Sequence, residues 1–410
     1  MYDVIVVGAR CAGAPTAMLL ARKGYRVLLL DRATFPSDTI STLIIWQTGV
    51  AKLKRWGLLD KVVKSGCPSI TRFTMDLGDF PLSGWGPPAD GAAESYAPRR
   101  TVLDKVLVDA AVTAGAELRD ECSVRELVVE DGRVVGICGT TKEGATFTEQ
   151  ARIAVGADGK HSVVARAGKA PAYSQHASRS CFYYTFWEDL PCDGYEVYWP
   201  EGKRYILKIP TNGNQVLVVV VWPHDEFTAF RADVERNYMA TLGLAPELAD
   251  SIGSARRISR ILGTGDVPNF FRKPYGPGWA LVGDTGYNKD PITAFGISDA
   301  FRDAELLAQA LDAGLSGLQQ LDQALEGYEQ KRNAVAMPLY EHTLSVANYQ
   351  PHSPKSFEVR AALRGNQVDT DRFFGAIAST VPRNEFFNRE NIQRIFRQAA
   401  TWAKDTAERG

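Results

Sequence analysis

The segment Gly8-Ala-Arg-Cys-Ala-Gly13 follows a short apolar run and precedes a stretch of good helix formers. Glycine at its two ends suits a dinucleotide-binding turn, because Gly8 permits a tight turn and Gly13 permits close packing of helix on strand. The free N–H groups and the dipole of the first helical turn would hold a pyrophosphate. The spacing therefore predicts cofactor contacts at Gly8, Arg10, Cys11, Ala12 and Gly13. Arg10 takes the place of the usual middle glycine, so either the backbone stays further from the phosphates or the guanidinium itself reaches the anion.

Asp31 stands at the end of the next strand-like run, where a carboxylate accepts hydrogen bonds from a ribose diol. The adjoining Arg32 is included among the predicted cofactor contacts. The plain alternative is a surface ion pair between these two neighbours, which would contribute little to stability.

Two later segments carry further candidate cofactor ligands. Gly156-Ala-Asp158-Gly159 directly follows a buried strand-like run, and Gly283-Asp284 follows another. The second segment continues through Asp290-Pro291 to Gly296-Ile297, where a helix begins near Ser298. A simple turn at Asp158 and a helix cap at Asp284 are the structural alternatives.

In this order, the three motifs resemble the FAD-binding motifs of flavoprotein monooxygenases of the para-hydroxybenzoate hydroxylase type. That superfamily also includes flavin-dependent halogenases and geranylgeranyl-reductase-like proteins. The resemblance covers roughly residues 1 to 345.

The resemblance implies a role for individual residues. Asp158 would organise the pyrophosphate region and the place where a nicotinamide cofactor docks, and Asp284 would bind the ribityl chain of FAD. Pro291 and Gly296 would lie against the isoalloxazine ring, and Arg100 matches an arginine that contacts the FAD phosphates. The predicted cofactor-binding set is Gly8, Arg10, Cys11, Ala12, Gly13, Asp31, Arg32, Arg100, Asp158, Gly283, Asp284, Pro291, Gly296 and Ile297.

The sequence departs from the family pattern in three places. Arg10 replaces the second glycine of the fingerprint and Asp31 replaces the usual glutamate, and FAD binding remains the expectation with both. Ala294 stands where the family often has a glycine beside the flavin, which bears on how freely the ring can move.

An α/β framework has to bring these motifs together. Residues 3–7 and 26–30 have the pattern of buried parallel strands around a helix at 13–23. Between 178 and 222, aromatic and β-branched runs are separated by turn-forming pairs, which predicts an antiparallel sheet. Helices are further predicted at 102–114, 299–342 and after 351, a hairpin at 123–130 and 133–140, a strand at 151–155, and turns at Asp193-Gly194, Glu201-Gly202 and Asn212-Gly213.

The predicted fold is therefore a Rossmann-like FAD-binding domain with an antiparallel β-sheet substrate domain and C-terminal helices. The FAD-binding domain is expected to be discontinuous, because its motifs lie on both sides of the sheet-forming segment. The expected ranges are 1–75, 95–177 and 265–345 for the FAD-binding domain, 76–94 and 178–264 for the substrate domain, and 346–410 for the C-terminal helices.

Composition narrows the class of protein. The 410 residues carry a formal net charge of -1, which leaves no positive excess for binding a nucleic acid backbone. No apolar run is long enough for a membrane span, and the N-terminus lacks a signal-type pattern. The six cysteines form no C-x-x-C pair and the five histidines show no metal-ligand spacing, so we expect no zinc site, no disulfide framework and a cytoplasmic location.

The resemblance implies an NADH- or NADPH-dependent monooxygenase that hydroxylates an aromatic or other electron-rich small molecule through a flavin C4a-hydroperoxide. The nicotinamide cofactor would bind transiently, because the chain has one fingerprint and Gly263-Thr-Gly265-Asp266 is predicted to be a loop. Phe182, Tyr184 and Phe186 share one strand face, which is either ordinary core or a wall facing the substrate. The catalytic base stays open among Tyr183, Tyr184, Tyr198, Tyr205 and His224.

Three alternatives remain. A geranylgeranyl-reductase-like enzyme would need a long apolar tunnel, which the helices after residue 355 would line unless they simply pack. A halogenase would carry Trp-x-Trp-x-Ile-Pro and a lysine that relays hypohalous acid, but here Tyr205-Ile-Leu-Lys-Ile-Pro210 lacks both tryptophans. A protein that binds FAD without turnover is the third alternative. The amphipathic segment 389–397 is expected to pack on the main body, and the oligomeric state stays open.

Overall fold

A parallel sheet centred on β1 (Tyr2–Val7) forms the framework of the first unit. β1 pairs in parallel with β2 (Val27–Leu30) and with β10 (Thr146–Gly156), so the three strands end at the same edge of the sheet. Their apolar runs are buried, as expected of strands covered on both faces. The computed structural model describes residues 1–200 and 203–407, with side chains described up to Thr401. The sheet order is β19 (Tyr275–Gly276), β20 (Trp279–Leu281), β10, β1, β2, β7 (Glu117–Arg119).

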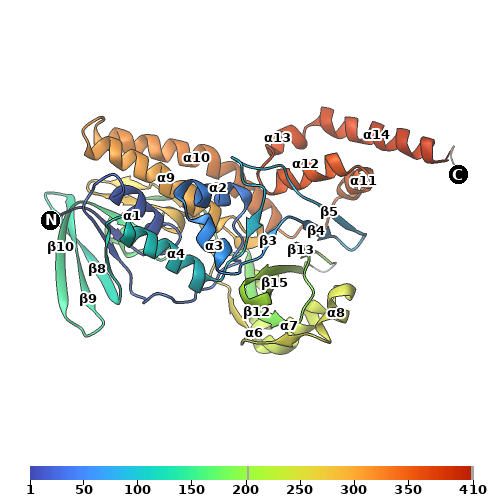
Figure 1. The fold of residues 1–410 in the computed structure, drawn as a ribbon, viewed down its shortest axis with the longest axis horizontal. Helices are drawn as coiled ribbons and strands as arrows, with labels where there is room; N and C mark the ends of the chain where they lie inside the picture. Colours follow the sequence, from blue (N-terminus) through green and yellow to red (C-terminus); the bar gives the residue numbers. More distant parts are fainter. Residues whose placement is uncertain (201–202, 408–410) are drawn as a thin grey trace.

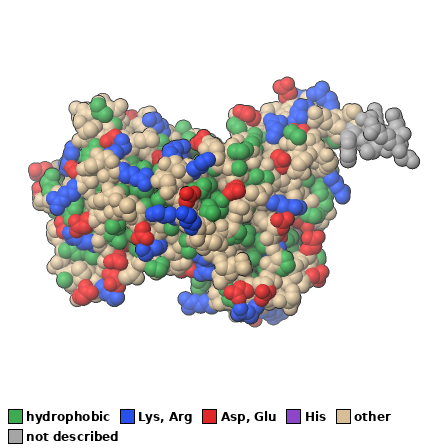
Figure 2. Space-filling view, in the orientation of Figure 1, with side chains coloured by type: hydrophobic (Ala, Val, Ile, Leu, Met, Phe, Trp, Pro, Cys, Tyr) green, Lys and Arg blue, Asp and Glu red, His purple; other side chains and the backbone are tan. Residues whose placement is uncertain are grey.

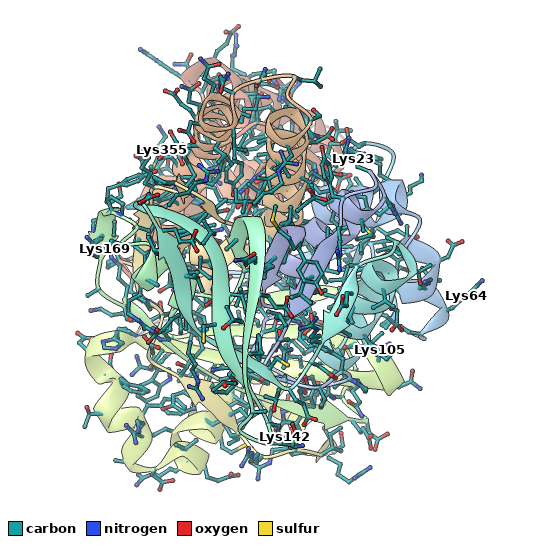
Figure 3. All side chains as sticks on the ribbon, turned by 90° about the vertical axis from the view of Figure 1, so that its left-hand side faces the viewer. Lys23, Lys64, Lys105, Lys142, Lys169 and Lys355 are labelled. Atoms are coloured by element: carbon teal, nitrogen blue, oxygen red, sulfur yellow. The ribbon has the colours of Figure 1, made fainter. Side chains whose placement is uncertain are left out.

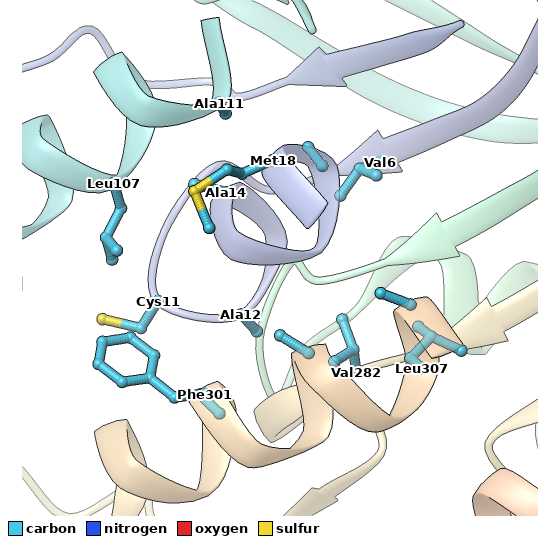
Figure 4. Close-up of a cluster of buried hydrophobic side chains, with 14 of the residues drawn as sticks. Val6, Cys11, Ala12, Ala14, Met18, Leu107, Ala111, Val282, Phe301 and Leu307 are labelled. Atoms are coloured by element: carbon cyan, nitrogen blue, oxygen red, sulfur yellow. The ribbon is translucent and has the colours of Figure 1, made fainter. Parts of the chain in front are cut away.

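Helices cover one face of this sheet. α1 (Gly13–Ala21) packs between α4 (Arg100–Thr113) and α9 (Gly296–Leu315). Figure 4 shows Met18 of α1 beside Val6 of β1, with Leu107 of α4 and Phe301 of α9 completing the cluster. Because α9 belongs to the third motif and α1 to the first, this packing brings distant motifs together. Three further elements lie near this unit: α2 (Gln47–Trp56), α3 (Leu59–Lys64) and α5 (Val163–Ala167).

A hairpin of β8 (Cys122–Glu130) and β9 (Arg133–Thr141) covers the other face, at the left of Figure 1. β10 is longer than predicted because it joins two sheets. Its first half pairs antiparallel with β9, and its second half, from Ala151, pairs in parallel with β1. The polar first half has no apolar run, so the sequence marks only the buried second half as a strand.

The second sheet is antiparallel except at one place. Its central strands are β12 (Ser180–Glu188), β15 (Gln215–Pro223), β14 (Tyr205–Thr211) and β13 (Tyr195–Tyr198). β13 then pairs in parallel with β4 (Phe73–Asp76), a strand from far upstream. β5 (Pro81–Gly84) and β16 (Arg256–Arg257) lie at the edges of this sheet. A separate three-stranded sheet contains β11 (Ala172–His176), β18 (Asn269–Arg272) and β21 (Tyr287–Asn288), and β3 (Ser69–Ile70) pairs with β6 (Ser95–Tyr96).

Alternation along β12 gives the second sheet two different faces. Phe182, Tyr184 and Phe186 belong to one buried cluster, as predicted, whereas Tyr183 and Trp187 belong to another. The second cluster is closed by three short helices at the bottom right of Figure 1. These are α6 (Phe227–Ala232), α7 (Val234–Leu242) and α8 (Pro246–Ile252).

One local prediction is wrong, and another falls outside the described residues. Residues Gly263 to Asp266 were expected to form a loop, but Leu262–Thr264 is a short strand, β17, which pairs with β12. Gly263 lies against Tyr183, where a side chain on residue 263 would meet that ring, so glycine serves strand packing there. The predicted turn at Glu201-Gly202 lies outside the described residues.

The C-terminal helices pack against the second sheet. α10 (Leu321–Val346) runs beside α9 and leads into α11 (Pro354–Leu363), α12 (Gln367–Ile377), α13 (Arg383–Phe386) and α14 (Arg389–Ala407). Phe374 of α12 and Ile395 of α14 belong to the same buried cluster as Phe182, so segment 389–397 packs on the body as predicted. No described helix is both long and apolar enough to cross a bilayer. Figure 2 shows positive and negative side chains interspersed over one face.

Candidate functional site

A cavity of about 680 Å³ lies where the three sequence motifs meet. This volume is within the range of cofactor and small-molecule sites. Every residue of the predicted cofactor-binding set lines it except Gly13. The motifs touch directly: a Cβ on Gly8 would meet the carbonyl oxygen of Ala157 at 2.4 Å, and one on Gly283 would meet the Ala12 Cβ at 2.8 Å.

Gly13 lies behind the wall of the cavity and shapes it. A Cβ at this position would lie 1.7 Å from the carbonyl oxygen of Gly8, so no other residue fits without moving the backbone. Gly8 itself has φ +101°, a conformation that favours glycine. The two glycines therefore shape the turn between β1 and α1, and Gly8 also faces the cavity.

The carboxylate of Asp31 holds the same turn. It accepts hydrogen bonds from the backbone N–H of Ala9 at 2.7 Å and of Ala33 at 2.9 Å. The alternative of a surface pair with Arg32 does not apply, because Asp31 is buried and makes no ion pair with its exposed neighbour among the described contacts.

Beneath the first motif, a buried carboxylate binds both predicted arginines. The Asp104 Oδ2 lies 2.5 Å from Nη1 of Arg10, and its Oδ1 lies 2.8 Å from Nη2 of Arg100. The Cys11 Sγ also lies 3.5 Å from Oδ1, and burial raises the pKa of this thiol to about 12, which keeps it protonated. Two guanidinium groups against one carboxylate leave a net positive charge beside the cavity, which suits a pyrophosphate.

Sequence analysis missed Asp104. It lies one helical turn beyond Arg100, and an acid four residues from an arginine on a helix is a recognisable pairing signal. Its complete burial is what distinguishes it from an ordinary surface pair, and that is visible only in the fold.

Asp158 caps a helix while lining the cavity. Its carboxylate accepts from the Ser162 hydroxyl at 2.6 Å and from the Val163 N–H at 2.7 Å, at the start of α5. Burial raises the pKa of Asp158, against these hydrogen bonds. The Gly159 N–H donates to the Thr285 hydroxyl at 3.0 Å, which links the second and third motifs.

Asp284 differs from Asp31 and Asp158 in its hydrogen bonding. Among the described residues, none donates a hydrogen bond to its carboxylate, and the side chain is accessible from the cavity that it lines. Burial raises its pKa, opposed by the charges of Lys289 and Arg100. A carboxylate with open acceptor positions in a cavity can accept from ligand hydroxyl groups.

The segment that leads into α9 forms the far wall. It contains a short turn of 3₁₀ helix, η4 (Pro291–Thr293), capped by Asp290 through a hydrogen bond from the Ile292 N–H at 3.1 Å. Burial raises the pKa of Asp290 to about 6, and its Oδ2 has no partner among the described residues. Ala294 adopts φ +56°, a left-handed conformation that glycine adopts more readily than alanine.

The five candidate bases are scattered. Tyr184 lines the first cavity, but burial raises its pKa to about 12, so it stays protonated near neutral pH. Tyr183 and Tyr198 lie in the cluster under α6–α8, on the opposite face of the sheet. His224 stacks on Phe227 outside the cavity, and Tyr205 lines a second cavity.

The second cavity, of about 450 Å³, lies between the second sheet, η4 and helices α10 to α14. Pro291 and Ala294 line the first cavity, whereas Ile292 and Thr293 line the second. Phe295 lines both. A single short segment therefore separates the two cavities. Across the described residues, no group of three His, Cys, Asp or Glu side chains is arranged to hold a metal ion, and all six cysteines are free thiols.

Known proteins resemble this chain over most of its length. A digeranylgeranylglycerophospholipid reductase of Methanocella arvoryzae is 27% identical over 324 residues, which cover 76% of this chain and 79% of the relative. The myxobacterial chondrochloren halogenase CndH has the same fold, with a TM-score of 0.79, 21% identity and coverage of 97% and 96% of the two chains. PqsL, a probable FAD-dependent monooxygenase from Pseudomonas aeruginosa, gives a TM-score of 0.71 with 21% identity, over 91% of this chain and 98% of PqsL.

These likenesses confirm the predicted superfamily and fold class, and they leave the reaction open among reductase, halogenase and monooxygenase. Residues 1–343 match the family described as FAD binding domain, and the chain therefore belongs to this family of FAD-dependent oxidoreductases.

Proposed function

We propose that the protein is an FAD-dependent monooxygenase that takes electrons from NADH or NADPH and hydroxylates an aromatic small molecule. The observation that carries this proposal is the pair of cavities on the two sides of the Pro291–Phe295 segment. When bound, FAD would supply the electron transfer and the activation of oxygen. The protein has to hold the cofactor, place the substrate and exclude water.

The first cavity has the chemistry that FAD requires. Arg10 and Arg100 would face the pyrophosphate with the net positive charge left after Asp104 is paired. Asp284 would accept hydrogen bonds from ribityl hydroxyl groups with its open carboxylate. Asp31 and the turn that it holds would lie at the ribose, as we expect from the position of Asp31 after β2.

The start of α9 suits the reactive end of the cofactor. Gly296 is exposed to the cavity, and a side chain placed there would meet no atom within 4 Å, so a flat ring has space to approach the backbone. The positive end of this 20-residue helix would stabilise negative charge on a reduced ring.

The second cavity supports an aromatic substrate. Trp46, Phe73, Tyr195, Tyr205 and Phe295 contribute to its lining. Aromatic walls bind flat apolar molecules and exclude water, which protects a reactive oxygen species from unproductive decay. We further propose that residues 76–94 and 178–264 act as a substrate domain and that 1–75, 95–177 and 265–345 act as the FAD-binding domain, with β4 (Phe73–Asp76) lying across the boundary between them.

A halogenase is less well supported by the residues between the cavities. Lys208, within the segment that resembles the halogenase motif, is buried with its Nζ 2.7 Å from the Glu196 carboxylate, on the face under α6–α8. No lysine lines both cavities among the residues described. A lysine that relays an oxidised halide from one cavity to the other is therefore not available in this position.

A prenyl reductase is the second candidate. Digeranylgeranylglycerophospholipid reductases are among the relatives in sequence, and the C-terminal helices line an apolar cavity here rather than merely packing. The second cavity is modest in volume for two long prenyl chains, which favours the aromatic substrate.

The test combines purified FAD-loaded protein, NADPH or NADH, isotopically labelled dioxygen and a panel of aromatic acids, phenols and geranylgeraniol. The proposal predicts substrate-stimulated NAD(P)H oxidation and one labelled oxygen atom in an aromatic product. Reduction of a prenyl double bond without oxygen consumption would establish the second candidate instead. A halogenated product formed only with bromide or chloride would contradict both.

A further inference from the structure

The charged side chains that line the second cavity are all positive, a feature that is separate from its aromatic wall. Three cationic side chains line it, from Lys355, Arg360 and Arg383, and no aspartate or glutamate is among the described lining residues. All three cations come from helices α11 and α13, which lie beyond residue 343, where the family match ends. The feature therefore belongs to the C-terminal helices of this chain.

Arg383 is the cation without a protein counter-ion. Its guanidinium packs on the Phe387 ring at 4.9 Å, and among the described residues no carboxylate lies within ion-pairing distance. Burial lowers the pKa of Arg383, as expected when no opposite charge compensates the loss of water. The pKa of His342, another lining residue, is lowered to about 4 by burial and then by the charge of Arg383, so this charge acts inside the cavity.

Arg360 adds an unused donor. Asp79 accepts from its Nε at 3.2 Å and from its Nη2 at 2.9 Å, which fixes the guanidinium, but the buried Nη1 has no hydrogen-bond partner among the described groups. Trp46 Nε1 is buried and unpartnered as well. Buried N–H groups are almost always satisfied, so these two unpaired donors make the wall of this cavity electropositive, although neither atom is exposed to the cavity itself.

Lys355 occupies the outer end of this arrangement. It is exposed, and Figure 3 shows it at the outside of the molecule, like Lys23 and Lys64. A cation at the mouth of a cavity attracts anions from solution without fixing their position.

We propose that the second cavity binds an aromatic carboxylate, with the carboxylate held by Arg383 and the ring against the aromatic wall next to Ile292–Phe295. This inference deepens the proposed function, and its orientation toward the FAD cavity rests on that function. The aromatic wall includes Trp46, whose ring lies 5.2 Å from Tyr195 and 5.7 Å from Phe295. Such a site would bind the acid much more tightly than the neutral amide of the same ring system.

The experiment is calorimetric titration of the FAD-loaded protein with three matched pairs: naphthoate and naphthamide, benzoate and benzamide, and indoleacetate and indoleacetamide. At least one acid is expected to bind about tenfold or more tightly than its amide. Arg383→Gln is expected to remove this preference and to leave amide binding unchanged, and Arg383→Lys to restore part of it. Lys355→Gln should have a smaller effect because its charge is solvated.

Arg389→Gln is the matched control, since Arg389 is exposed at the start of α14 and lines neither cavity. FAD content and melting temperature verify that each variant is folded. Equal affinity for acid and amide, absence of binding by all three acids, or an unchanged preference in Arg383→Gln would overturn the inference. Tighter, Arg383-dependent binding of farnesyl phosphate than of any aromatic acid would also overturn it.

Binding needs no turnover, so the two proposals fail separately. Acid-selective binding without labelled oxygen in any product would contradict the monooxygenase and leave the carboxylate site intact. Labelled hydroxylation of a neutral aromatic compound, with no preference for acids in binding, would support the monooxygenase and contradict the carboxylate site.

Discussion

Three of the aspartates that line the first cavity, Asp31, Asp158 and Asp284, differ in how many hydrogen bonds the protein already donates to their carboxylates. Asp31 and Asp158 accept backbone and hydroxyl hydrogen bonds that hold a turn and a helix end. Asp284 has no such donor among the described residues and is accessible from the cavity. Substituting Asp31 or Asp158 would therefore disturb the fold and FAD binding together, whereas Asp284 separates the two effects.

Asp284→Ala is expected to weaken FAD binding on the order of tenfold or more, because the lost carboxylate would accept hydrogen bonds from ligand hydroxyl groups. Titration of apoprotein with FAD, followed by flavin fluorescence, measures this change. Asp250→Ala, on the exposed surface of α8, is the control. An Asp284→Ala protein that retains stoichiometric FAD with unchanged affinity would remove Asp284 from the site.

His342 makes stability depend on pH in a defined direction. The pKa of His342 is about 4 in the fold, against an ordinary value of 6.5, so between these values the unfolded chain binds the extra proton. Stability is therefore expected to rise with pH from 4 to 6.5 and to be independent of this group above that range. His342→Gln should remove this rise in the free energy of unfolding, which is on the order of 1–2 kcal/mol for a partly buried group.

Urea unfolding of both proteins at a series of pH values measures the difference. His224→Gln, at a site outside both cavities, is the control for losing a histidine. Parallel pH profiles for wild type and His342→Gln would show that the neutral His342 does not contribute.

The backbone motifs of the site can be predicted from residue types, but the hydrogen-bond and ion-pair partners of its side chains cannot. Gly8, Gly13 and Gly283 are recognisable because close approach demands glycine. The same segment gives no sign that Arg10 turns toward Asp104, 94 residues away in the sequence. Long-range pairing depends on the fold and leaves no local pattern.

At the scale of elements, the turn between β1 and α1 is the most constrained piece of the site. Gly13→Val is expected to abolish FAD binding and to lower the yield of folded protein, because its Cβ would lie 1.7 Å from the Gly8 carbonyl oxygen. FAD content after purification and the melting temperature measure both effects.

Gly327→Ala is the matched control in α10. A Cβ there meets no atom within 4 Å and the residue is helical, so this variant should be as stable as wild type or up to about 1 kcal/mol more stable. A Gly13→Val protein with normal FAD content would contradict the close contact of turn and helix.

Strand alternation explains which aromatic residues sequence analysis placed correctly. Phe182, Tyr184 and Phe186 share a face because β12 is regular throughout. The strand Leu262–Thr264 was missed because Gly263 and Gly265 give the segment the composition of a loop. Its pairing partner is also distant in the sequence, since Gly263 lies opposite Tyr183, 80 residues upstream. β13 beside β4 could not be predicted either, since a parallel pair between distant segments has no turn signal.

At the scale of the whole molecule, one buried cluster joins parts that the sequence keeps far apart. It contains Leu43 and Phe73 from the first part of the chain, Tyr184 from the second sheet, and Phe374 and Ile395 from the C-terminal helices. The sequence indicates helices after residue 351 but not which surface they cover. That surface decides whether they line a cavity, so the sequence leaves lining and simple packing open as alternatives for these helices.

The two cavities depend on different parts of this assembly. The first is lined by residues between Val7 and Ala300, whereas the second needs α10 to α14. Phe374 is fully buried, lies 4.7 Å from Phe73 between ring centroids, and ties α12 to β4 and β5. A defect at Phe374 should therefore affect the second cavity before the first.

Phe374→Ala is expected to lower the free energy of unfolding by about 3–5 kcal/mol, because a large buried ring is replaced by a cavity. In the protein that remains folded, naphthoate affinity should fall while FAD affinity stays within about twofold, a small free-energy change. Val368→Ala, at a residue of the same helix that is 73% exposed, should change neither. Loss of FAD and naphthoate binding in parallel would instead mean that α12 supports the whole molecule as one unit, and that the two cavities cannot be separated by packing.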